Sequence, residues 1–281
     1  MRHGRFTQTE LSKTRGPREF AQQIRGVGMI VIKTPAEIES MQHAGILAAE
    51  ALREVARVVR PGISGQELNK IGEEYVRARG GMPSFKGYRG FPGSICLSFN
   101  DEVVHGIPGR RRLKEGDVVA IDLGAEVEGF HGDLAGTFPV GEVSHDLARL
   151  LKVTRESLYK AIDAVRPGKR LGDVGAAVQG HVEAAGFSVV RDFAGHGIGR
   201  HLHEEPQIPN FGEPGTGQPL RVGMTLAIEP MVNAGGYEVT MDDDGWTVRT
   251  KDHKPSAHFE HTVAVTENGA LVLTAIPDGV V

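Results

Sequence analysis

One ten-residue stretch occurs twice in this chain. Residues 113–122 read LKEGDVVAID, and residues 220–229 read LRVGMTLAIE. Both copies run from a leucine and a basic residue through a glycine turn into an apolar strand that ends Ala-Ile before a carboxylate. Burying a carboxylate is costly unless it is paired or holds a metal. A chain that does so twice in the same register therefore predicts a cation between Asp122 and Glu229.

The repeat extends to both sides of these strands. The sequence VRPG leads into a helical pattern at residues 59–62 and again at residues 165–168, and residues 132–137 correspond to residues 259–263. Each half thus supplies two acids. They are Asp122 and Asp133 in the first half and Glu229 and Glu260 in the second. Internal duplication predicts two similar units packed about a pseudo-twofold axis, with a site on that axis that takes ligands from both.

Composition narrows the class of protein. A chain of 281 residues is long enough for one large domain, which the interleaved repeat favours over two small ones. The net charge of -4 gives no general attraction to nucleic acid or to an anionic membrane. No apolar run reaches the ~18 residues of a membrane-spanning helix. The only cysteine, Cys96, excludes an internal disulfide and is typical of a reducing compartment, so we expect a cytoplasmic protein.

Residues 1–29 differ from the rest of the chain. They are basic and show no helical or strand period, and the apolar run at residues 29–32 is too short for the h-region of a signal peptide. We expect a disordered arm, or an upstream extension with Met29 as the true start. An arm that contacts the ribosome or RNA ranks behind these two. Residues 30–281 are expected to form a single domain.

Helices precede strands in each half. Thr34 and Ser64 each stand three residues before a glutamate, as in a capping box, and helical apolar patterns follow as far as residues 59 and 75. Such patterns recur over residues 147–165 and 171–182. Short apolar or β-branched segments between turn signals predict strands at residues 94–99, 117–123, 137–140, 188–190, 224–229, 258–265 and 270–274. This order predicts an α+β fold with helices on one face of a curved, mainly antiparallel sheet.

Residues 194–206 present histidines on a glycine-rich backbone. Arg200 occupies the last glycine position of a dinucleotide loop, and no Lys-Ser/Thr pair follows as in a phosphate loop. The four acids with one or more of His196, His201 and His203 form a carboxylate-rich set whose charge balances two divalent ions. Such ligands suit Mn, Fe, Co or Zn. Two metals about 3.5–4 Å apart can activate a water and polarise a carbonyl, so the set predicts a hydrolytic site.

Six separated segments carry the most specific signal. They are residues 100–108 (NDEVVHGIP), 130–133 (FHGD), 195–199 (GHGIG), 203–206 (HEEP), 228–231 (IEPM) and 259–262 (FEHT). In this order they resemble the signature segments of type I methionine aminopeptidases, and the resemblance covers about residues 30 to 275. It implies the pita-bread fold, whose duplicated halves agree with the repeat. It also implies that residues 30–281 are a single catalytic metallopeptidase domain.

The resemblance implies two divalent metal ions and the residues that hold them. The metal-binding side chains are Asp122, Asp133, His196, Glu229 and Glu260. Asp133 and Glu260 would bridge both ions. Asp122 would chelate one ion, and His196 and Glu229 would serve the other.

The resemblance also implies the catalytic roles. A bridging water would attack the first peptide carbonyl, with Glu229 as proton shuttle. His203 would hydrogen-bond the carbonyl or the developing oxyanion, and His105 the amide that is cleaved. The substrate's free α-amine would reach a metal, which explains cleavage at the N-terminus.

The methionine pocket implied by the resemblance has apolar or softly polar walls that suit a thioether. With His203, the substrate-binding residues are Tyr88, Phe91, Cys96, His105 and Trp246. Two positions depart from bacterial members of the family: Phe85 stands where a cysteine is common, and Leu202 where an aromatic residue is common. A small second residue in the substrate is implied by the family alone.

The remaining histidines are interpreted as structural. His201 is expected to be a neighbour of the site rather than a ligand. Hydrogen-bonded packing is expected for His43, His131, His145, His181, His253, His258 and His261. Residues 242–245 (DDDG) begin like a calcium loop, but the twelfth position is not the required glutamate, so we expect a turn.

Three alternatives share parts of the pattern. A prolidase or Xaa-Pro aminopeptidase would share the fold and ligand types but usually has a substantial N-terminal domain. A type II methionine aminopeptidase usually inserts a helical subdomain between the ligand histidine and glutamate, and the interval from His196 to Glu229 is too short for it. An inactive pita-bread binding module predicts eroded ligands, whereas all five are intact.

The sequence therefore favours a metal-dependent aminopeptidase that removes the initiator methionine from nascent polypeptides. Its expected partners are nascent N-termini, with the ribosome near the exit tunnel as a further contact. We expect a monomer in the cytoplasm that binds neither a membrane nor a specific nucleic acid.

Overall fold

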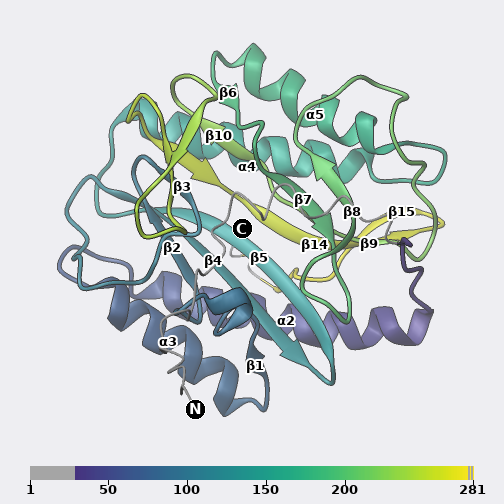
Figure 1. Ribbon diagram of the computed structural model, residues 1–281, viewed down its shortest axis with the longest axis horizontal. Coiled ribbons are helices and arrows are strands. Elements are labelled where there is room, and N and C mark those ends of the chain that lie inside the picture. The colour runs from purple at the N-terminus through teal and green to yellow at the C-terminus, as the bar shows by residue number, and fades with distance from the viewer. Residues whose placement is uncertain (1–28, 278, 280) are drawn as a thin grey trace, which may run out of the picture.

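The structure is a computed structural model that describes residues 29–277, 279 and 281 (Figure 1). Apart from Met29, the arm predicted at residues 1–29 lies outside the described residues. Every strand pairing in the described part is antiparallel. The same part of the chain holds no helix that is long and apolar enough to cross a membrane.

The main sheet has a symmetric strand order. Across the described residues it runs β1-β4-β5-β14-β9-β7-β8, with β2 also paired to β4 and β15 to β14. In the first half β4 (Val118–Val127) pairs with β5 (Phe130–Pro139), and in the second β9 (Thr225–Ile228) pairs with β14 (Glu260–Thr266). The halves meet where β5 pairs with β14. This arrangement confirms the pseudo-twofold duplication that the repeat predicted.

Two helix pairs cover the sheet, one from each half. They are α2 (Pro35–Arg57) with α3 (Gly65–Ala78), and α4 (His145–Ala164) with α5 (Leu171–Ala184). In the view of Figure 1, α2 and α3 lie below the curved strands and α4 and α5 lie above them. Both predicted capping boxes are formed, at Thr34 and Ser64. The α+β fold predicted from the order of helices and strands is confirmed.

Helix α2 packs directly behind the strand that carries Asp133. A Cβ atom on Gly132 would lie 2.4 Å from the backbone nitrogen of Gly45, so only a glycine allows the helix to approach this closely. Buried apolar side chains of α2, including Met41, Leu52 and Val55, fill the space between helix and sheet. The acid therefore stands on a strand that is held rigidly from behind.

Several strand boundaries differ from the prediction. Strand β5 begins at Phe130 rather than at residue 137. The prediction missed its first half because two glycines and Asp133 interrupt the apolar pattern there. The segment predicted at residues 258–265 is divided by Phe259 into two strands. The remaining elements are β1 (Met82–Pro83), η1 (Tyr88–Gly90), β2 (Cys96–Phe99), β3 (Glu102–Val104), β6 (Ser188–Val189), β7 (Ala194–Gly197), β8 (Glu204–Pro209), β10 (Met231–Asn233), β11 (Val239–Met241), β12 (Val248–Thr250), β13 (Ser256–His258) and β15 (Gly269–Val272).

Candidate active site

Strand register brings three of the predicted acids to one face of the sheet. Asp122 on β4 and Glu260 on β14 are both register partners of Ala135, one on each side of β5. Asp133 lies two residues before Ala135 on β5, and side chains two apart share a face of a strand. The three acids therefore converge although they come from three strands.

The second half of the chain completes the cluster. Glu229 follows β9 directly, and His196 lies on the neighbouring strand β7. Nδ1 of His196 donates a hydrogen bond of 2.8 Å to the Gly197 carbonyl, so its Nε2 keeps a lone pair. This Nε2 lies 3.7 Å from Oε1 of Glu229. A ring whose other nitrogen is tied to a backbone carbonyl is oriented as metal-binding histidines usually are.

Buried oxygens of the cluster have no hydrogen-bond partner. Among the described residues these include Oδ1 of Asp122, Oδ1 of Asp133 and Oε1 of Glu260. Ligand atoms of Asp133, His196 and Glu260 lie within 4.8 Å of one another. Buried carboxylate oxygens without partners are strongly unfavourable unless a cation binds them. The arrangement therefore fits a divalent metal.

The electrostatics of the cluster point to the same conclusion. Burial raises the pKa of Asp133 to about 7. Burial and the neighbouring acids raise the pKa of Asp122 and of Glu260 well above the usual range, and burial followed by the charge of Asp133 does so for Glu229. Without a cation the cluster therefore retains protons, which metal binding must displace. Burial lowers the pKa of His196 to about 4, so this ligand is neutral near pH 7.

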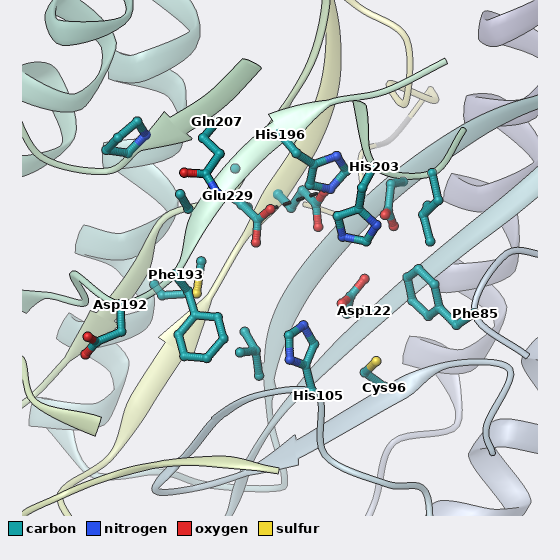
Figure 2. A pocket seen from close by; sticks show the side chains of 18 of the residues that line it. Phe85, Cys96, His105, Asp122, Asp192, Phe193, His196, His203, Gln207 and Glu229 are labelled. Atoms are coloured by element: carbon teal, nitrogen blue, oxygen red, sulfur yellow. Dashed lines mark ion pairs between the residues drawn. The ribbon is translucent and has the colours of Figure 1, made fainter. Parts of the chain in front are cut away.

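A single cavity of about 320 Å³ opens above these acids. It is lined by every predicted site residue: Asp122, Asp133, His196, Glu229, Glu260, His105, His203, Tyr88, Phe91, Cys96 and Trp246. Figure 2 shows His196 and His203 on one side of Asp122, and His105 and Cys96 on the other. The structure thus brings all eleven residues together, while their individual roles stay predictions.

Two further histidines face each other across the cavity. The hydroxyl of Tyr88 and Nδ1 of His203 form a hydrogen bond of 3.0 Å, and their rings stack with centroids 5.2 Å apart. His105 follows β3 with a positive φ of 60°, and its ring meets the edge of Phe193. Burial lowers the pKa of His105 to about 4 and that of His203 well below its usual range. Both rings are therefore neutral near pH 7.

The apolar end of the cavity is built around an aromatic pair. Phe91 and Trp246 meet edge to face with ring centroids 5.1 Å apart. Oδ1 of Asp244 accepts hydrogen bonds from the backbone nitrogens of Trp246 and Thr247, so residues 242–245 form the predicted turn and hold the indole in place. Cys96 lies beside this end, and burial raises the pKa of its thiol.

Comparison with known proteins decides the family. The metallopeptidase family M24 matches residues 39–267. This chain belongs to metallopeptidase family M24. Methionine aminopeptidase 1 of Bacillus subtilis is 52% identical over 248 residues, which cover 88% of this chain and 100% of that protein.

Solved structures agree with this M24 assignment. The crystal structure of methionine aminopeptidase from Thermotoga maritima is similar with a TM-score of 0.87 at 51% identity, over 88% of this chain and 100% of that one. The prolidase from Pyrococcus horikoshii gives a TM-score of 0.69 at 21% identity, over 88% of this chain and 64% of that one, which shows the fold alone. These comparisons confirm the predicted family, the pita-bread fold and the prediction of a methionine aminopeptidase. They also support the use of divalent metal.

The cavity of this M24 chain is also lined by residues that the sequence did not predict. They are Val104, Arg191, Asp192, Phe193, Ala194, Gly195, Gln207, Pro209, Phe211 and Met231, and Figure 2 shows Asp192, Phe193 and Gln207 on the far side of Glu229 from Asp122. Phe85 and Leu202, the two departures from the family pattern, line the cavity as well. Val104, Gly195 and Met231 lie inside the signature segments, and the other unpredicted residues lie within about five residues of one. Position in or beside a motif was the only available signal.

The other histidines of this M24 chain divide into three groups. His131, His181 and His261 bond Ser84, Glu156 and Thr274 respectively, as predicted. His43, His145 and His253 are exposed, so the packing prediction is wrong for them, although His253 bonds Asp101. His201 is exposed and does not line the cavity, as expected of a neighbour.

His258 is a distinct correction. It is buried as predicted, but its Nε2 has no hydrogen-bond partner. Burial, together with the charge of His105, lowers its pKa to about 3. The interpretation of His258 as a hydrogen-bonded packing residue is therefore wrong.

Proposed function

We propose that this chain removes the N-terminal methionine from nascent polypeptides with the aid of two divalent metal ions. One observation carries the proposal: the cavity that contains the unpaired carboxylates also contains the apolar slot of Phe91, Cys96 and Trp246. A peptide whose first side chain enters this slot has its first peptide bond beside the acids.

Four carboxylates and one imidazole would hold the metals. The residues are Asp122, Asp133, His196, Glu229 and Glu260. Two divalent ions balance the four negative charges, and Co, Mn, Fe or Zn suit this mixture of oxygen and nitrogen donors. When bound, the ions supply an activated water and polarise the scissile carbonyl.

The protein's own groups then move protons and stabilise charge. Glu229 takes a proton from the attacking water and returns it to the leaving amine, a task that a carboxylate lining the cavity beside the other acids can perform. Donation by the Tyr88 hydroxyl to Nδ1 of His203 places the ring proton on Nε2. That N–H is donated to the substrate carbonyl as its oxygen becomes negative. His105, on the opposite wall, hydrogen-bonds the amide that is cleaved.

The remaining parts of the proposal concern substrates and setting. We infer a preference for a small second residue, because the bulky Phe193 and Met231 line the cavity, and Figure 2 shows Phe193 on the far side of Glu229 from Asp122. We also propose that residues 30–281 act as one catalytic domain, and that the enzyme is a cytoplasmic monomer working on N-termini near the ribosomal exit tunnel. The net charge of -4 favours neither a membrane nor a specific nucleic acid as a partner.

The proposal is tested with the full chain after removal of metal and reloading with Mn²⁺ or Co²⁺. Peptides that begin Met-Gly should release methionine, and peptides that begin Met-Trp should release much less. A Gly-Pro dipeptide is the competing substrate. Hydrolysis of the proline dipeptide without methionine release would transfer the chain to the prolidase branch of family M24.

A further inference from the structure

An unpaired imidazole nitrogen lies directly behind two of the proposed metal ligands. Nε2 of His258 is 3.7 Å from Oε2 of Glu229 and 3.9 Å from Oε2 of Glu260. The His258 residue is only 2% exposed, and this nitrogen has no hydrogen-bond partner among the described residues. Buried polar atoms are normally hydrogen-bonded, so an exception aimed at two carboxylates requires a reason.

The topology holds this ring where it is. His258 ends β13 and is the register partner of Met231, which lies two residues after Glu229. The Thr137 hydroxyl donates to the His258 carbonyl at 2.8 Å and accepts from its backbone N–H at 2.9 Å. The N–H and the carbonyl of His258 are therefore both hydrogen-bonded to Thr137 on β5, the strand that carries Asp133.

We propose that His258 is a positioning residue that donates its Nε2–H to the carboxylates of Glu229 and Glu260 and holds them ready to bind metal. The proposal rests on the function proposed above. A neutral imidazole carries one N–H, and two facing carboxylates favour its location on Nε2. A carboxylate movement of less than about 1 Å brings either oxygen within the ~3.2 Å of a hydrogen bond.

The geometry favours a donor over a sixth metal ligand. Oε1 of Glu229 faces Nε2 of the ligand His196, whereas the other oxygen, Oε2, faces His258. His258 also does not line the cavity, in contrast to all five proposed ligands. It therefore supports the carboxylates from behind, on the side away from substrate.

The test compares two substitutions at this position. His258→Leu removes the donor, and His258→Gln keeps an N–H that can reach the same oxygens. We expect the dissociation constant for Mn²⁺, measured by isothermal titration calorimetry on metal-depleted protein, to rise about 10–100-fold in His258→Leu. His258→Gln should recover most of this loss. The visible spectrum of the Co²⁺-loaded protein should change in His258→Leu and return towards wild type in His258→Gln.

A matched control and a second variant make the outcome decisive. His261 is another buried histidine, but its ring bonds Thr274, so His261→Leu should lower stability and leave Mn²⁺ affinity within about threefold of wild type. If His258→Leu does not fold, Thr137→Val keeps the ring and removes its anchor, and it should weaken Mn²⁺ binding.

Three results would overturn the proposal. The first is wild-type Mn²⁺ affinity in His258→Leu, or in Thr137→Val if His258→Leu does not fold. The second is an equal loss of Mn²⁺ affinity in His258→Leu and His258→Gln, which would mean direct ligation or simple packing. The third is a loss of Mn²⁺ affinity in His261→Leu equal to that in His258→Leu. Methionine release by the wild-type enzyme is measured separately. A wild-type protein that binds Mn²⁺ through His258-supported carboxylates but releases no methionine would refute the proposed function alone.

Discussion

Lys33 and Glu204 form an ion pair that is almost completely buried, with side chains 3% and 7% exposed. The backbone nitrogen of Lys33 also donates to the Gly223 carbonyl at 2.8 Å, which ties the segment before α2 to the turn before β9. Glu204 follows His203 directly, and its other oxygen accepts from the backbone nitrogen of His201 at 3.2 Å. The pair thus fixes the loop that carries a proposed catalytic histidine.

Lys33→Met should damage both stability and turnover. Removing one partner of a buried pair leaves the other charge uncompensated, which typically costs about 3–5 kcal/mol of unfolding free energy. A looser loop should lower kcat more than it raises KM, because His203 acts on the developing charge. Urea unfolding and steady-state kinetics on a Met-Gly peptide measure the two effects. The control Arg200→Ala breaks the exposed ion pair with Glu37 and should lower the unfolding free energy by less than about 1 kcal/mol. Equal losses of unfolding free energy in the two variants would contradict the prediction.

Asp133→Asn should abolish turnover. The amide removes a negative charge from the centre of the cluster, so the loss should exceed the ~100-fold typical of residues that only support a metal ligand. Methionine release and Mn²⁺ binding should fall together. Asp146→Asn is the control, because that side chain is 91% exposed and should change neither quantity. An Asp133→Asn enzyme that keeps a tenth of wild-type activity would exclude Asp133 as an essential ligand.

The duplicated strand explains why so much of the site was accessible from sequence. Asp122 and Glu229 occupy equal positions in the two copies, and each copy ends in a buried strand of the same sheet. The convergence of Asp133 and Glu260 could be expected from the repeat. The two acids are brought together by the pairing of β5 with β14. Within this pairing the backbone nitrogen of Asp133 donates to the hydroxyl of Thr262, a residue far away in the chain.

The parts that sequence could not supply depend on tertiary contacts. Strand β7 reads AGHG, which lacks the β-branched residues of an ordinary strand, and only its pairing with β8 and β9 makes it one. Phe193 lies just before one signature segment and Met231 ends another, but nothing in an apolar side chain distinguishes cavity lining from core packing. His258 looks like a packing residue in the sequence, and only the folded chain places its Nε2 3.7 Å from Glu229 and 3.9 Å from Glu260.

Stability of the metal-free protein should fall as pH rises. The pKa of Asp133 is about 7 in the folded protein, against about 3.9 in an unfolded chain, so between these values the folded state binds more protons. Because the unfolded state binds fewer protons, the unfolding free energy decreases with increasing pH across this window. Asp122, Glu229 and Glu260 shift in the same direction. Mn²⁺ should therefore raise Tm more at pH 8 than at pH 5.

Thermal unfolding with EDTA or with Mn²⁺, at several values between pH 5 and pH 8, checks this dependence. The Asp133→Asn protein supplies the internal control, since one buried acid is gone and the decline of Tm in EDTA should be shallower. A metal-free wild-type protein whose Tm is constant or rises between pH 5 and pH 8 would contradict the expected sign.

Tyr88→Phe should slow the reaction without weakening substrate binding. The phenyl ring keeps the stacking on His203 but loses the hydroxyl that bonds Nδ1 at 3.0 Å, so the proton of the imidazole is no longer directed to Nε2. Loss of one hydrogen bond of about 0.5–1.5 kcal/mol corresponds to a roughly 2- to 10-fold lower kcat, with KM nearly unchanged. His203→Ala should lose far more. Tyr237→Phe is the control, because Tyr237 is 40% exposed and does not line the cavity, and its kcat should equal that of the wild type. A wild-type kcat in Tyr88→Phe would mean that Tyr88 does not orient His203.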